Sequence, residues 1–284
     1  MRAVLFRLLV LTVILVLPAG IARAANVEFP DLQAAVPGAT AATYLDLARQ
    51  VLPDLTLDNG VYRGSEIIAT RHLGGADMAA EPPEAFTIFN VAALPARADG
   101  RDGLALLFDL GEGVDTAEGF AVLALFELGE KPILLDAAQI GFDRNTYFRD
   151  PATVTLNGDN DLLLTMSAHF NSNQGYVTSA MILVRNDRLE LVDTVFTFDD
   201  RGCGYERIQL PDFGAGGGGG LYADIAITVT ETSRRTGETC DGEDLPEEGT
   251  RTIGATYRWD DAQSRFAPDS DALKALAREN EARF

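Results

Sequence analysis

Three short stretches of the chain are continuously apolar, and they limit how the strands that contain them can pack. They cover residues 104–108, 120–126 and 180–184. A strand with one face in water alternates apolar and polar side chains, whereas an unbroken apolar run indicates burial on both faces. The runs therefore predict sheets that each pack between two others.

These runs belong to a pattern of strands and turns that recurs about every 60 residues. Short apolar stretches are separated by clusters of Gly, Asn and Asp, which is typical of mainly β proteins. Three copies are recognisable, at residues 102–136, 161–193 and 224–266. We interpret them as one supersecondary unit copied three times.

The predicted fold class is mainly β, built from antiparallel meander repeats in a propeller-like arrangement. Propeller rings usually close with four to eight blades, so residues 55–91 would have to supply at least one more. A β-sandwich with one thick core is the alternative. A short helix is expected near each end of the mature chain.

The two helices are predicted from apolar residues at helical spacing. The first covers about Thr43 to Leu52 and is ended by Pro53. The second follows Pro268, with Asp269 or Ser270 as its N-cap residue and with Leu273, Leu276 and Ala277 as its apolar stripe. Between the first helix and the repeats, Asp58-Asn59-Gly60 predicts a tight hairpin.

The first 24 residues have the three parts of a secretory signal peptide. Arg2 and Arg7 precede an apolar run from Leu8 to Leu17, and Ala22-Arg23-Ala24 supplies the small residues of a cleavage site. A membrane-spanning helix needs ~20 apolar residues, about twice the length of this run. We therefore expect a periplasmic or secreted protein, with no membrane insertion of the mature chain.

The expected organisation of the chain follows from these features. It has a signal peptide, an N-terminal segment with the short helix and the hairpin, a β-repeat domain and a C-terminal helix. In this order they are residues 1–24, 25–85, 86–267 and 268–284.

The chain is strongly acidic, with a formal net charge of −20. Removal of residues 1–24 takes away three arginines and no acidic residue, which leaves −23 on the mature chain. Such a surface repels nucleic acid and anionic lipid, because both are bound through basic side chains. It suits a cationic partner or a divalent metal. The expected partner is an envelope or extracellular component.

Both cysteines, Cys203 and Cys240, lie in stretches rich in turn-forming residues. In an oxidising compartment an even number of cysteines favours a disulfide. Closing a loop of about 37 residues would stabilise the fold by about 3–4 kcal/mol in the chain-entropy model. Two separate thiols are the alternative.

Residues 156–163 read Leu-Asn-Gly-Asp-Asn-Asp-Leu-Leu. This stretch resembles the FG-GAP or VCBS type of propeller repeat, in which an Asn-Gly-Asp-Gly calcium loop precedes an Asp-Leu strand start. Residues 257–266 also look like the final strand pair of exported proteins with such repeats. The loop is shorter than that of the family, and Asn160 stands at the second Gly position. The resemblance implies a propeller-like fold with a calcium site.

Asn157, Asp159 and Asp161 are the candidate calcium ligands. They place oxygen atoms at every second residue around a glycine, which is the spacing of calcium-binding loops. An ordinary β-turn favours the same residue types for backbone reasons, so this alternative stays open. Calcium is the one cofactor that the sequence suggests.

Motifs for catalysis are missing from the sequence. The chain has two histidines, His72 and His169, and none of the motifs G-x-S-x-G, S-x-x-K and H-E-x-x-H occurs. Ser167 shares a strand face with His169, and we expect this face, with Thr165, to be polar and exposed. Neighbours at that spacing point side by side and rarely align for proton transfer. No catalytic residue is therefore assigned.

Two function classes remain. The favoured one is an exported β-repeat protein that binds another component of the cell envelope, or acts by occluding it. The alternative is an exported hydrolase that uses paired carboxylates. A cavity that holds two acidic side chains, one with a raised pKa, would favour the hydrolase.

Overall fold

The computed structural model describes residues 26–39, 41–89, 91–112, 119–157, 159–218, 220–237 and 245–283. In this part of the chain the mainly β architecture is confirmed, and nearly all strand pairs are antiparallel. The strands form sheets of eight, five and three strands. The predicted signal peptide, residues 1–24, lies outside the described residues.

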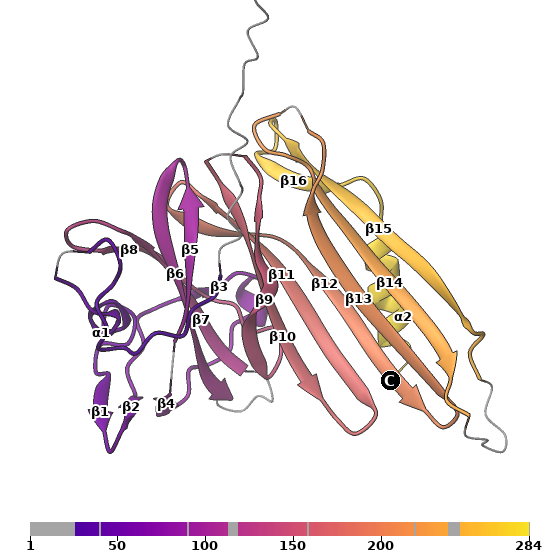
Figure 1. Cartoon of the computed structure of the whole chain (residues 1–284), viewed down its shortest axis with the longest axis horizontal. Helices are drawn as coiled ribbons and strands as arrows, with labels where there is room; N and C mark the ends of the chain where they lie inside the picture. The colour runs from indigo at the N-terminus through magenta and orange to yellow at the C-terminus, as the bar shows by residue number, and fades with distance from the viewer. Residues whose placement is uncertain are drawn as a thin grey trace, which may run out of the picture.

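The predicted repeats are three meanders of four consecutive strands each (Figure 1). The first unit is β5 (Ala92–Ala98), β6 (Arg101–Glu112), β7 (Gly119–Glu127) and β8 (Ile133–Gln139). The second is β9 (Asn145–Thr155), β10 (Asp161–Phe170), β11 (Gln174–Arg185) and β12 (Arg188–Gly202). The third is β13 (Tyr205–Ala215), β14 (Ile225–Arg235), β15 (Gly249–Asp260) and β16 (Arg265–Pro268). The sequence predicted the last three strands of each unit and missed the first.

The propeller-like arrangement is not confirmed, because the second and third units share one sheet. This sheet has eight strands in the order β16 to β9. Its two halves are joined through β12 and β13, which pair only at Asp200–Gly202 and Tyr205–Arg207, beside the turn that connects them. The stacking of this sheet with the five-stranded sheet fits the alternative, a sandwich.

Two of the continuous apolar runs, residues 104–108 and 120–126, are explained by the position of the first unit, which is covered on both faces. Leu106 and Phe108 belong to a core cluster with the N-terminal segment. Ala105 and Leu107, which alternate with them on β6, belong to a second cluster with β9, β10 and β11. The prediction of burial on both faces is therefore confirmed. The layers on either side are the N-terminal segment and the second unit.

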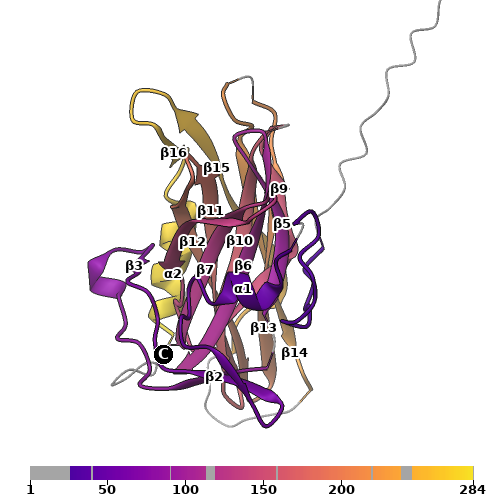
Figure 2. The same cartoon turned by 90° about the vertical axis from the view of Figure 1, so that its left-hand side faces the viewer.

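The N-terminal segment covers the outer face of the first unit. It contains the short elements α1 (Tyr44–Ala48), β1 (Thr56–Asp58), β2 (Val61–Gly64), β3 (Arg71–His72), the 3-10 turn η1 (Ala76–Met78) and β4 (Phe86–Ile88). Thr43 and Asp46 form a capping box at the start of α1, which is shorter than predicted. The hairpin is confirmed: Asn59 and Gly60 have φ angles of 51° and 86°, as a tight two-residue turn requires. Figure 2 shows this segment from the front, with α1 and β2 nearest the viewer.

The C-terminal helix α2 (Ala272–Glu281) packs against β12 and β15. It begins after Asp271, slightly later than predicted. Leu273 and Leu276 enter a third core cluster, together with residues of β10, β11, β14 and β15. Among the described residues no helix is long and apolar enough to cross a membrane.

Candidate binding cavity

A cavity of about 850 Å³ lies where the first unit, the second unit and the chain before β5 meet. This is within the range of small-molecule sites, about 300–1,000 Å³. Most of its lining is apolar or aromatic. The lining residues are Asn26, Val27, Phe29, Thr87, Ile88, Phe89, Ala92, Leu107, Asp109, Leu110, Gly111, Asn145, Thr146, Tyr147, Phe148, Arg149, Asp150 and Ala152.

One wall of the cavity is β9, the terminal strand of the eight-stranded sheet. Six consecutive residues, Asn145–Asp150, line the cavity. Because successive side chains of a strand point to opposite faces, a lining by consecutive residues means that the cavity follows the unpaired edge of β9. The N-terminal part of the lining is held in place by Glu28 and Ala93, whose backbones exchange two hydrogen bonds of 2.8 Å each.

Three aromatic side chains of the cavity lining are exposed. Phe29, Phe89 and Tyr147 keep 64%, 79% and 49% of their surface accessible to water. Single exposed apolar residues are common on protein surfaces, but several that gather around one cavity are typical of binding sites. These rings come from three segments that are far apart in the sequence.

Asp109 places a carboxylate in this apolar surrounding. It lies near the end of β6, and its carboxylate accepts hydrogen bonds of 3.2 Å from the Gly111 amide and 3.3 Å from the Thr146 amide. Burial raises the pKa of Asp109, and these two hydrogen bonds offset only part of that effect. No arginine, lysine or histidine among the described residues forms an ion pair with it.

The one arginine of the lining, Arg149, directs its guanidinium to groups outside the cavity. Nη1 donates to Ser179 Oγ at 2.7 Å and Nη2 donates to the Pro211 carbonyl at 3.3 Å. The guanidinium also lies over the Phe213 ring, 5.0 Å from its centre. Burial lowers the pKa of Arg149. The carboxylates of the lining, those of Asp109 and Asp150, are therefore not neutralised by Arg149.

The predicted calcium ligands lie elsewhere, in the turn between β9 and β10. Asn157 Oδ1 accepts hydrogen bonds from the Asp159 amide at 2.8 Å and the Asn160 amide at 2.7 Å, as in an Asx turn. Asp161 is buried, and its carboxylate accepts hydrogen bonds from the Arg97 amide and from Thr155 Oγ1. Two of the three side chains therefore already serve as acceptors within the protein. Across the described residues no group of three or more His, Cys, Asp or Glu side chains could hold a metal ion.

Calcium binding stays a prediction, and a melting experiment tests it. A ligand present at a hundred times its Kd and bound only by the folded state adds about 2.7 kcal/mol of stability. If the loop binds calcium, the Tm in millimolar calcium should exceed that in chelator, and Asp159→Ala should abolish the difference. If the turn is held by its own hydrogen bonds alone, the two Tm values should agree.

The histidines are engaged in local contacts. The His72 ring bonds the Gly141 carbonyl through Nε2 at 3.0 Å and accepts from the Gly74 amide through Nδ1 at 2.9 Å, so it is a buried structural residue. His169 Nδ1 lies 2.6 Å from Asp143 Oδ2, and the ring stacks on Tyr176.

The expectation that Thr165 and Ser167 form an exposed polar face was wrong. Both are buried, with 1% of their surface exposed. Ser167 Oγ lies 2.9 Å from Thr146 Oγ1 and accepts a hydrogen bond from the Phe142 amide. It is buried because this face of β10 is turned toward the first unit.

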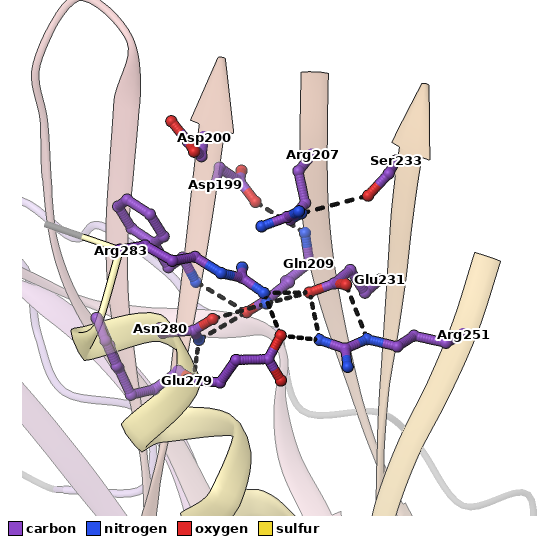
Figure 3. Close-up of polar contacts among 12 residues, drawn as sticks. Asp199, Asp200, Arg207, Gln209, Glu231, Ser233, Arg251, Glu279, Asn280 and Arg283 are labelled. Atoms are coloured by element: carbon purple, nitrogen blue, oxygen red, sulfur yellow. Dashed lines mark hydrogen bonds and ion pairs between the residues drawn. The ribbon is translucent and has the colours of Figure 1, made fainter. Parts of the chain in front are cut away.

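A cluster of polar side chains surrounds the end of α2 (Figure 3). Glu231 of β14 accepts from Arg251 at 2.8 Å and from Gln209 at 2.7 Å, and it also pairs with Arg283. Gln209 and the fully buried Asn280 exchange two hydrogen bonds between their amide groups. The cluster joins α2 to β13, β14 and β15, which is a structural role.

The structure describes only one of the two cysteines of the predicted disulfide. Cys203 lies in the turn between β12 and β13 and is not a free thiol. Its predicted partner Cys240 lies outside the described residues. The bond between the two cysteines stays a prediction.

Comparison of the chain with models of protein families, with curated proteins and with solved structures gives no match.

Proposed function

We propose that this chain is an exported binding protein and that the cavity beside β9 is its ligand site. The observation that carries the proposal is the gathering of Phe29, Phe89 and Tyr147 around a cavity of about 850 Å³. Exposed rings cost free energy in water, and a bound apolar group removes them from it. The proposed ligand therefore has a large apolar part.

Export is the other half of the proposal. The predicted signal peptide of residues 1–24 supports a periplasmic or secreted protein, and the predicted pairing of Cys203 with Cys240 would fit such a compartment. Cleavage after Ala24 would place the mature N-terminus two residues before Val27, which lines the cavity. The proposed ligand is therefore a molecule outside the cytoplasm.

A neutral fluorescent probe tests the binding site. Phenylnaphthylamine, which becomes brighter in apolar surroundings, is expected to bind the mature protein in a saturable way. Phe89→Ser should weaken that binding by about fivefold to tenfold, because one ring of the site is lost. Fluorescence titration measures both affinities.

The matched control is Phe170→Ser. Phe170 is also exposed, at 69%, but it lies at the end of β10 and does not line the cavity. This variant should bind the probe as the unchanged protein does. Equal losses in the two variants, or no saturable binding by the unchanged protein, would contradict the proposed site.

The hydrolase is the second candidate, and one observation favours it. Asp109 and Asp150 line the same cavity, and the pKa of Asp109 is raised. A carboxyl group with a raised pKa in the same cavity as a second acid is an arrangement that acid catalysis uses. A hydrolase converts its ligand, whereas a binding protein returns it unchanged.

A further inference from the structure

We infer that the cavity selects small amphipathic cations, whose ammonium or guanidinium group pairs with Asp109 while the apolar part contacts the aromatic rings. This inference rests on the proposed function, since it names the ligand class of the same site. It is carried by the position of Asp109 in the lining, by the absence of a counter-charge among the described residues and by the exposed rings of the same lining.

Asp109 has no cationic partner among the described residues, in contrast to two other shielded carboxylates that face arginines. Asp136 receives two hydrogen bonds of 2.7 Å from Arg71, and Glu231 is held by Arg251 and Arg283. Asp109, in contrast, receives only two long hydrogen bonds from backbone amides. A carboxylate that is removed from water without a counter-ion is costly, so a cation that enters the cavity gains the interaction that the fold leaves open.

The rest of the lining favours a positive charge as well. Arg149 is committed to Ser179 and Pro211, and the second carboxylate of the lining, Asp150, adds negative charge. The faces of Phe29, Phe89 and Tyr147 attract cations through their negative π surfaces. The net charge of −20 over the whole chain draws cations toward the protein and repels anions.

The size of the cavity sets the form of the ligand. A volume of about 850 Å³ is far larger than an inorganic cation and matches an organic molecule of drug size. The apolar lining residues Ile88, Leu107 and Leu110 offer no polar partner to a bare ion, whereas they can pack against an apolar body. An organic cation with an apolar body satisfies both parts of the site.

Three matched probes test the inference by displacing phenylnaphthylamine. Phenylbutylamine, phenylbutanol and phenylbutyrate share one apolar body and carry a positive, a neutral and a negative end group at about pH 8. The amine is expected to bind at least about tenfold more tightly than the alcohol, and the acid more weakly than both. Asp109→Asn should remove the preference for the amine and leave the affinity for the alcohol unchanged.

Asp150→Asn is the matched control, because it removes a carboxylate from the same lining. It should keep most of the preference for the amine, and a loss in this variant instead of Asp109→Asn would overturn the assignment to Asp109. The melting temperature of each variant verifies that it is folded. An alcohol that binds as tightly as the amine would overturn the inference while the cavity stays a binding site. If phenylnaphthylamine does not bind at all, the proposed function fails and the inference fails with it.

Discussion

Replacing Glu231 by alanine is expected to lower the free energy of unfolding by about 3–5 kcal/mol, the usual cost of breaking a buried ion pair. Glu231 is 6% exposed, and its carboxylate bonds Gln209, Arg251 and Arg283. Without it, Arg283 of the C-terminal segment loses one of its two acidic partners, and Gln209 loses an acceptor. Urea denaturation, followed by circular dichroism, measures the change.

The control is an ion pair on the surface. Arg63 and Asp58 are both more than half exposed, and such pairs contribute about 0–1 kcal/mol. Arg63→Ala should therefore leave the midpoint of unfolding nearly unchanged. If Glu231→Ala has as small an effect as Arg63→Ala, the cluster at the end of α2 does not stabilise the fold.

The same cluster predicts how stability depends on pH. Burial raises the pKa of Glu231, but the hydrogen bonds from Arg251 and Gln209 and the charges of Arg251 and Arg283 outweigh it, so the pKa lies below its ordinary value of 4.5. A lowered pKa means that the stabilisation is complete above that ordinary value and is lost as the pH falls through the folded value. Glu231→Gln should therefore show a weaker loss of stability in acid than the unchanged protein.

Replacing Phe126 by alanine is expected to cost about 3–5 kcal/mol, because it leaves a cavity in a closely packed core. Phe126 is completely buried on β7 and faces the N-terminal segment. Its neighbour Leu125 is also buried but faces the second unit. Leu125→Ala should cost about 2–5 kcal/mol for the same reason. Thermal and urea unfolding of both variants test whether the strand is buried on both sides.

The matched control is Phe170→Ala, which removes an equal ring from an exposed position. Its effect should lie within about 0.5 kcal/mol. A small effect at Leu125 together with a large effect at Phe126 would mean that the second unit does not cover the first one, and the stacking of the two sheets would be wrong.

A strand could be predicted from the sequence where all of its side chains, on both faces, are buried. Residues 120–126 are apolar without interruption because two layers cover them, and this pattern needs no knowledge of the partner layers. The first strand of each unit was missed because its pattern is broken. β9 contains Arg149, Asp150 and Pro151, and β13 contains Pro211, so neither has a regular apolar pattern.

The arrangement of the units could not be predicted, because it depends on contacts between distant residues. The pattern of residues 120–126 requires cover on both faces, but it does not say whether the cover is another blade or the N-terminal segment. In a propeller and in a stack of sheets alike, this strand is buried on both faces. The short pairing of β12 with β13, which places the second and third units in one sheet, has no signature in the sequence.

The candidate site was missed for the same reason. Phe29, Phe89 and Tyr147 are unremarkable one by one, and only the fold brings them to one cavity. One signal was available: Asp109 is an acidic residue near the end of a buried strand, where a charge requires an explanation. The sequence pattern instead favoured the loop with Asn157, Asp159 and Asp161 as a site, since these residues are close together in the sequence.

Within each four-stranded unit every strand pairs with the next one along the chain, which has a consequence for the order of folding. Pairs of consecutive strands close short loops, and such contacts form quickly because little entropy is lost. If the chain is exported as proposed, unfolded and amino end first, its first unit can assemble while the third is still inside. A completed unit would then oppose backward movement of the chain. The helix α2 would emerge last and complete the third core cluster.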